Sequence, residues 1–450
     1  SVEEMFLLLS IAALCACVTS NAIFKGLTPS AKSTEIVYQI GDLSKSRVLP
    51  KHIKEGLAFL MENTCVNFYD NNDFPGRKVD LKIQNMPDFA CKVLNGVFHI
   101  ADCIGSRKTI QHEVTHFLGF CHTMDRDDWR DYIRIIPNIH NFTAFGDPTC
   151  ESVPANVAKY DYGSGMHQEI NEVAEPVHGE YIGTMGQSIR FAFTDYKSIN
   201  WLYNCAGKCA TQPNCMNGGY THPRDCKKCM CNKYYTGDFC ETPRNITKLD
   251  CATKKQHVWA IKEFGDASLP KSILNDDYRN RGDNLWDLIE APQNTRIHVE
   301  VISRSNVWAN TACVHSALEI NDGDLNHMGR MFCDPAQGAA IKRNFTARTN
   351  LVGVHAEYPM DRYVEMTATF TLKGCDAPLP PTTTTTTVKP STTTTPPTTT
   401  TTQKPTAPST TTTTVKPTTT TTVPTTSTKP TVVPPVTTTT TNPGEFQCDY

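Results

Sequence analysis

The residues best suited to chemistry lie between Thr109 and His122, in the run Thr-Ile-Gln-His-Glu-Val-Thr-His-Phe-Leu-Gly-Phe-Cys-His. His112 and His116 are four residues apart, so on a helix their imidazoles share one face and can bind one Zn²⁺. Glu113 directly follows the first histidine. We expect it beside the open coordination position, where it can take a proton from bound water.

A glycine and a third histidine complete the pattern HExxHxxGxxH. Gly119 can adopt a positive φ, end the helix and let His122 return as the third ligand. Three neutral ligands leave the +2 charge of the ion uncompensated, which favours ionisation of its water. We therefore predict one Zn²⁺ per chain, held by His112, His116 and His122.

The elements that position this site are expected within residues 21–205, where cysteines are sparse and helix and strand patterns mix. Residues 51–63 carry apolar side chains at a helical spacing, and a second helix is expected over residues 106–118. Short strands are expected at residues 35–40, 79–83 and 97–100. The pattern predicts an α+β domain, and about 170 residues can bury a real core.

Length, charge and cysteine content narrow the class of protein. The chain has 450 residues, a net charge of -3 and 19 cysteines. The near-neutral charge gives no sign of a nucleic-acid partner, and so many cysteines indicate an oxidising compartment. From Met5, an apolar run followed by small residues is typical of a signal peptide over residues 1–20. We expect a secreted protein with no membrane span.

Two cysteine-containing segments follow the predicted metal domain. Residues 206–241 hold six cysteines and are too short to build a core, so disulfides must staple them, and spacing alone leaves all pairings open. Residues 251–375 read as all-β, because apolar side chains alternate over residues 296–303 and 363–372. This alternation predicts a β-sandwich.

The end of the chain has a different composition. Residues 376–443 are nearly all Thr and Pro, which predicts a disordered, extended, O-glycosylated stalk. Residues 444–450 contain Cys448 and are interpreted as the start of a truncated cysteine-containing module. Three sequons, consistent with a secretory route, predict glycosylation at Asn141, Asn245 and Asn344.

The metal motif and the residues after it resemble the astacin family of metzincin zinc proteases, of the secreted nematode type. Arg126, Asp128 and Tyr132 fall where that family has its residues after the motif. Residues 160–167 resemble the family's Met-turn, with Met166 as an apolar floor under the metal. Residues 206–241 resemble an EGF-like module, and residues 251–375 resemble a CUB domain.

The resemblance also implies disulfides. Within the predicted protease domain and the EGF-like module it implies Cys65–Cys205, Cys91–Cys103, Cys121–Cys150, Cys209–Cys226, Cys215–Cys229 and Cys231–Cys240. Cys313–Cys333 matches the second CUB disulfide. The usual first CUB disulfide is missing, and Cys251–Cys375 is expected in its place.

The sequence departs from the family at three places. Gln168 stands two residues after Met166, where the family has a zinc-binding Tyr, and its amide is the predicted oxyanion donor. Thr123 replaces a Glu that binds the mature N-terminus. Leu27 follows Gly26 where the latency segment has an Asp, so activation through that residue is not expected.

We predict a zinc-dependent endopeptidase that hydrolyses extracellular proteins by zinc-activated water, with Glu113 as general base. The main alternative is a weakly active or inactive astacin-like binding protein, motivated by Gln168. A third is an adhesive or coat protein whose protease-like part is structural. A protein or glycan partner is expected at the CUB domain.

Overall fold

The computed structural model describes most of the chain between residues 21 and 375. The described ranges are 21–29, 32–44, 46–85, 91–100, 103, 107–137, 145–263, 285–305, 313, 317–333, 341–357 and 364–375. The predicted signal peptide, stalk and terminal module, and Asn141, lie outside them. Within the described ranges no helix is long and apolar enough to cross a membrane.

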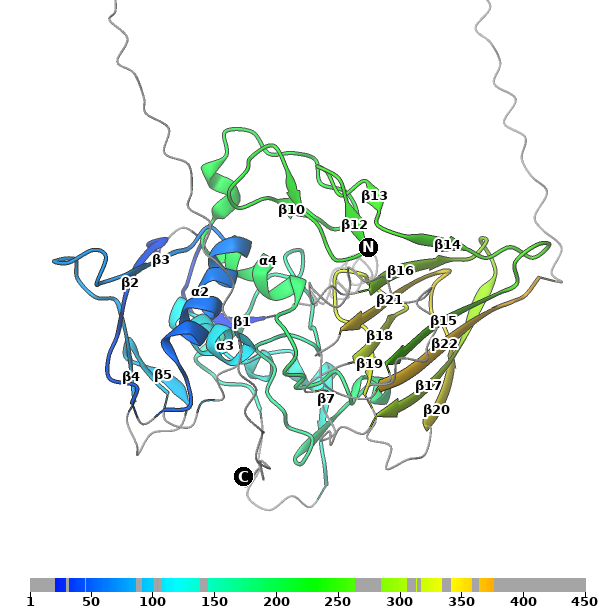
Figure 1. The fold of residues 1–450 in the computed structure, drawn as a ribbon, viewed down its shortest axis with the longest axis horizontal. Coiled ribbons are helices and arrows are strands. Elements are labelled where there is room, and N and C mark those ends of the chain that lie inside the picture. Colours follow the sequence, from blue (N-terminus) through cyan, green and yellow to red (C-terminus); the bar gives the residue numbers. More distant parts are fainter. Residues whose placement is uncertain are drawn as a thin grey trace, which may run out of the picture. The chain divides into compact units, whose positions relative to one another are not determined.

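A five-stranded sheet and two helices form the first half of the metal domain (Figure 1). The sheet has the order β3-β2-β4-β6-β5, and only β5 is antiparallel to its neighbour. Its strands are β2 (Glu35–Ile40), β3 (Asn67–Asp70), β4 (Leu81–Gln84), β5 (Lys92–Leu94) and β6 (Val97–His99). Because β5 is last in this order, it forms one edge of the sheet.

Helices α2 (Pro50–Asn63) and α3 (Arg107–Leu118) pack together. Gly56 permits the close approach, because a Cβ there would lie 2.6 Å from Cγ2 of Ile110. The predicted helix at residues 51–63 is confirmed with Pro50 as an added first residue, a position that suits proline because its missing N–H has no partner there. The predicted helix over residues 106–118 is found at Arg107–Leu118, and residue 106 lies outside the described ranges.

The second half of the metal domain has little regular structure. Strand β1 (Ala22–Phe24) pairs with β8 (Cys150–Ser152), and β7 (Ile133–Ile135) pairs with β9 (Ala174–Pro176). Helix α4 (Phe193–Leu202) ends the domain. Among the described residues of this half, the remainder consists of turns, loops and three short 3-10 helices (Thr123–Asp125, Trp129–Asp131 and Gly179–Tyr181), and no sequence periodicity predicts their course.

Apart from a 3-10 helix over Cys205–Lys208, the regular structure of residues 206–243 consists of two-stranded ribbons, as expected for a stapled segment. The ribbons pair β10 (Tyr220–Thr221) with β11 (Cys229–Met230) and β12 (Tyr235–Thr236) with β13 (Thr242–Pro243). Within the described ranges, eight disulfides join the pairs expected from the sequence, including Cys251–Cys375.

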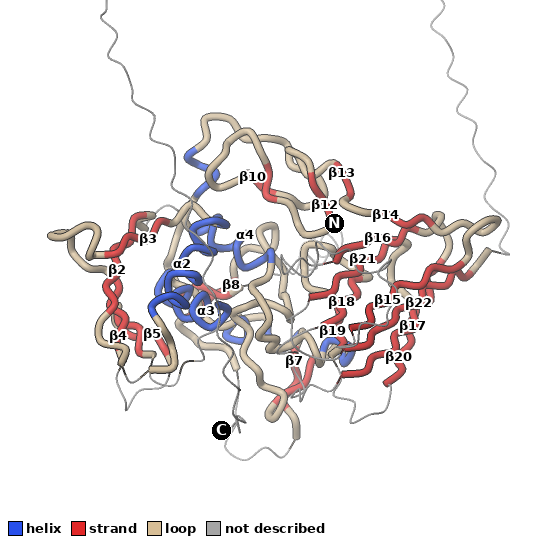
Figure 2. Tube along the Cα trace, in the orientation of Figure 1, coloured by secondary structure: helices blue, strands red, loops and turns tan. Residues whose placement is uncertain are grey.

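The following residues are mostly β-structure, in two sheets (Figure 2). One sheet has the order β14-β16-β21-β18-β19, with β14 (Ile246–Lys248), β16 (Leu285–Glu290), β21 (Leu351–Glu357), β18 (Ala317–Asn321) and β19 (Arg330–Phe332). The other has the order β15-β22-β17-β20, with β15 (Gln256–Glu263), β22 (Val364–Lys373), β17 (Arg296–Ser305) and β20 (Ile341–Thr346). Ile297, Val299 and Val301 are buried, so the predicted alternation is confirmed in β17. We call these two sheets the β-sandwich.

Candidate metal centre

Helix α3 and the turn after it place the three predicted histidines together. Gly119 has φ +108°, a left-handed conformation that ends the helix, and its N–H donates to the carbonyl of His116 at 2.9 Å. Two residues later the Cys121 N–H donates to the carbonyl of Ala22 at 3.0 Å, which ties the returning chain to β1. His122 follows directly.

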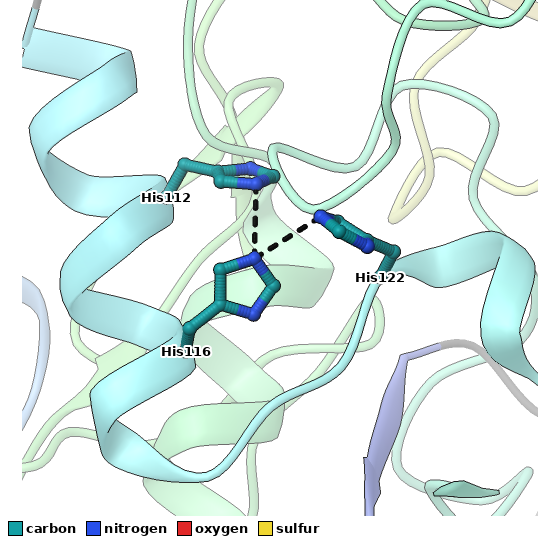
Figure 3. Close-up of side chains that lie close together, drawn as sticks. All are labelled: His112, His116 and His122. Atoms are coloured by element: carbon teal, nitrogen blue, oxygen red, sulfur yellow. Dashed lines mark hydrogen bonds between the residues drawn. The ribbon is translucent and has the colours of Figure 1, made fainter. Parts of the chain in front are cut away.

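The imidazoles of His112, His116 and His122 converge (Figure 3). The Nε2 atom of His116 lies 3.1 Å from Nε2 of His112 and 3.1 Å from Nε2 of His122. All three possible ligand atoms lie within 4.8 Å of one another. The structure therefore brings together the three histidines that the sequence predicts.

Hydrogen bonds fix which ring nitrogen carries the proton. Nδ1 of His112 lies 2.7 Å from the carbonyl oxygen of Gly165, and Nδ1 of His116 lies 2.8 Å from that of Phe120. A carbonyl oxygen can only accept, so both Nδ1 atoms are donors and both Nε2 atoms carry lone pairs. Burial lowers the pKa of His116 to about 4 and that of His112 well below its usual range, so both rings are neutral.

His122 has a carboxylate partner instead of a carbonyl. Its Nδ1 lies 3.4 Å from Oδ2 of Asp125, which also accepts from the His122 N–H at 3.1 Å. Converging lone pairs repel one another unless a cation lies between them. Three converging imidazoles, each with an oxygen partner at its outer nitrogen, are the donor set of a catalytic zinc site, so the residues present fit zinc.

Glu113 follows His112 on α3 and is buried, with 7 % of its surface exposed. Its Oε2 accepts a hydrogen bond from the N–H of Val93, in edge strand β5, at 3.1 Å. Burial raises its pKa to about 7, although the Val93 N–H and the charge of Lys108 act in the opposite direction. A carboxylate with a pKa near neutrality is suited to accept and return a proton.

The turn that carries Met166 underlies the histidines. Met166 is fully buried, and its carbonyl accepts from the N–H of Thr123 at 3.0 Å. Gly165, one residue earlier, supplies the carbonyl that orients His112. This turn therefore contacts both the first ligand and the residue after the third one.

The predicted residues after the motif tie that segment to the same turn. The buried Arg126 donates through Nε to Asp128 at 2.7 Å, and its guanidinium lies 5.2 Å from the ring centre of Tyr160. Tyr132 stacks on Tyr160 with ring centres 4.3 Å apart. Their role is to hold the chain after His122.

Gln168 does not join the site in this structure. Its side chain is exposed, and among the described residues no hydrogen bond links it to the histidines. Its carbonyl accepts from Nδ1 of His167 at 2.8 Å. Its role as an oxyanion donor stays a prediction.

Sequence reasoning missed a buried carboxylate under the Met166 turn. Asp195 in α4 accepts from the Gly165 N–H at 2.6 Å, from the Ser164 hydroxyl at 2.6 Å and from the Asn21 amide at 3.0 Å. Burial raises its pKa to about 6. The only sequence feature of Asp195 is its place as an acidic residue in the first turn of α4, which is typical of a helix start and does not indicate a site.

The sequence of this chain is similar to the sequences of known proteins. The profile of the family Astacin (Peptidase family M12A) matches residues 28–204. Zinc metalloproteinase nas-27 from Caenorhabditis elegans is 27% identical over 326 residues, which cover 64% of this chain and 71% of that protein. Zinc metalloproteinase nas-17 from the same organism is 26% identical over 337 residues, 72% of this chain and 74% of that protein.

Parts of the chain are also similar to two solved structures. High choriolytic enzyme 1, a hatching enzyme zinc-protease from Oryzias latipes (Medaka fish), is 23% identical with a TM-score of 0.30, covering 40% of this chain and 94% of its own. The CUB1-EGF-CUB2 domain of human MASP-1/3 is 12% identical with a TM-score of 0.19, covering 38% and 56%. These TM-scores are too low to bear on the fold.

A helix with two histidines and a glutamate, a glycine turn, a third histidine and a buried methionine define a zinc metallopeptidase. Residues 28–204 match the astacin family, and the chain is a zinc metalloendopeptidase with one zinc per chain as its cofactor.

Proposed function

We propose that this chain is a secreted endopeptidase that cleaves extracellular proteins, with Glu113 as its general base. The observation that supports this proposal best is the position of Glu113. It is a buried carboxylate with a pKa raised to about 7, one residue after the ligand His112. The predicted domain, 21–205, would then hold the general base and all three metal ligands.

Bound zinc lowers the pKa of a water molecule and polarises the scissile carbonyl. Glu113 accepts the proton of the attacking water and hands it to the leaving amine. The Val93 N–H, 3.1 Å from Oε2, holds the carboxylate in one orientation during both transfers. Burial excludes bulk water from the same carboxylate.

Strand β5 gives a reason for peptides as the substrate class. It is the edge of the sheet and its middle residue, Val93, contacts Glu113. An extended peptide that adds to this edge as a further strand passes directly by the base. Such binding uses hydrogen bonds to the main chain of the peptide and does not require a chain end near the base. This supports cleavage within a chain.

An extracellular location is supported by the eight disulfides within the described ranges, since such bonds persist in oxidising compartments. We assign residues 1–20 to a signal peptide, 206–241 to an EGF-like module, 251–375 to a CUB domain with a protein or glycan partner, and 376–443 to the stalk. Asn245 and Asn344 are exposed, as glycosylation requires.

The test compares casein digestion by the purified chain and by Glu113→Gln, each with and without a zinc chelator. Digestion by the unchanged chain alone, abolished by the chelator, supports the proposal. A chain that holds zinc but digests nothing favours the inactive binding protein that Gln168 motivates.

A further inference from the structure

The β-sandwich contacts the metal domain close to the Met166 turn. Main-chain groups at Cys313 and at residues 329–331 of the sandwich pair with residues 183–188 of the metal domain. Four hydrogen bonds of 2.9–3.0 Å make this contact: Cys313 N–H to Gly183 O, Ser188 N–H to Cys313 O, Thr184 hydroxyl to Gly329 O, and Met331 N–H to Thr184 hydroxyl. The contact is therefore specific in register.

Met328 packs against the stretch of chain just before Met166. Its side chain is 4% exposed and lies on the main chain of Gly163, where a Cβ would stand 2.1 Å from the Met328 Sδ. Its N–H lies 3.2 Å from Oδ1 of Asp161, a carboxylate that is 1% exposed. A sandwich residue thus contacts the Met166 turn directly.

Asp161 joins three parts of the molecule. Besides the Met328 N–H, it accepts from the Gly163 N–H at 2.9 Å and from the Thr194 hydroxyl of α4 at 2.7 Å. Two residues after Gly163 is Gly165, whose carbonyl orients the ligand His112. The three residues from Gly163 to Gly165 therefore connect the residue that Met328 contacts to the carbonyl that orients a metal ligand.

A buried ion pair holds the same contact. Glu319 of the sandwich is 1% exposed and pairs with Arg190 of the metal domain and with Lys233 of the preceding segment. A buried charge left without its partner is strongly destabilising, so this pairing resists separation of the parts. The sandwich is held where Met328 can support the turn.

We propose that Met328 is a positioning residue of the metal centre, through which the sandwich holds the Met166 turn and, with it, His112. The proposal rests on the proposed function only for its kinetic consequence. The expected effect of Met328 on zinc release depends only on the three histidines binding zinc, and not on catalytic activity. The sandwich is then part of the catalytic unit in addition to any binding role.

The test uses the full chain and the variants Met328→Ala, Met328→Leu and Lys342→Ala. Lys342 is the control, because it is an exposed residue of the sandwich that pairs with Glu300. Zinc release to excess chelator, kcat and KM on one peptide, and thermal stability are measured. We expect Met328→Ala to release zinc about 3–10-fold faster, near or below the 10–100-fold effects typical of groups that touch the ligands.

The kcat of Met328→Ala should fall by a similar factor with KM unchanged, and Met328→Leu should restore most of both. Lys342→Ala should match the unchanged chain. Lower thermal stability of Met328→Ala with unchanged zinc release and kcat would overturn the proposal. If the alanine variant is not secreted, Met328→Val is measured in its place, with the same expected results. If no variant hydrolyses peptide but zinc release still differs, the proposed function fails and the positioning role holds.

Discussion

The Nδ1 atom of His112 donates a hydrogen bond to the carbonyl oxygen of Gly165 over 2.7 Å. This bond leaves the Nε2 lone pair of His112 facing the other histidines, and it links the zinc helix to the turn that carries Met166. The position of the first ligand therefore depends on a residue 53 positions further along the chain.

Moving that carbonyl should weaken metal binding. A Cβ on Gly165 would lie 2.3 Å from Cδ2 of the buried Phe191 ring, so in Gly165→Ala the ring, the turn or both must shift. We expect zinc affinity to fall by roughly 10–100-fold, as is typical when the partner of a ligating histidine is disturbed. Competition with a chromogenic chelator measures this.

Gly179→Ala is the matched control, because a Cβ at Gly179 meets nothing within 4 Å. It should bind zinc like the unchanged chain. Equal affinities for Gly165→Ala and Gly179→Ala would show that the carbonyl does not orient His112.

The local parts of the site could be predicted from the sequence. His112 and His116 share a helix face because their spacing matches the helical period, and Gly119 marks the helix end. The contact of Asn21 with Asp195 spans 174 positions and follows no period, so no pattern could predict it. Strand β5 has only three residues, too few for an alternation to be read.

The disulfide Cys121–Cys150 should hold the third ligand. It lies next to His122, and its two cysteines are 29 positions apart. Replacing both cysteines by Ser removes a constraint typically worth about 2–4 kcal/mol. We expect a lower unfolding temperature and faster zinc release, measured by calorimetry and chelator trapping.

Replacing Cys231 and Cys240 by Ser is the comparison, because that pair lies in the short segment after the metal domain. It should change zinc release less than loss of Cys121–Cys150 does. The reverse order would contradict an anchoring role beside His122.

Acid should destabilise the sandwich through His355. Burial and the charges of Arg190 and Lys233 lower the pKa of His355 to about 4 from 6.5, although Glu319 acts in the opposite direction. Between those pH values the unfolded chain binds a proton that the folded chain does not. Stability contributed by this group is therefore present above about pH 6.5 and is lost as the pH falls toward 4.

Urea unfolding of the metal-free chain at pH 7 and pH 5 measures this loss. His355→Gln should lose less stability between the two pH values than the unchanged chain. His178→Gln, at an exposed histidine, should behave like the unchanged chain. Equal losses in all three would exclude His355 as the titrating group.

The most direct test of the catalytic assignment combines metal analysis with peptide hydrolysis for Glu113→Gln and His116→Ala. Glu113→Gln keeps the shape of the side chain but cannot accept the proton. It should hold one zinc per chain while kcat falls by about 10²–10⁴-fold, the range typical of general-base loss. His116→Ala should lose both zinc and activity. A Glu113→Gln chain that binds zinc and hydrolyses the peptide at the unchanged rate would contradict the assignment.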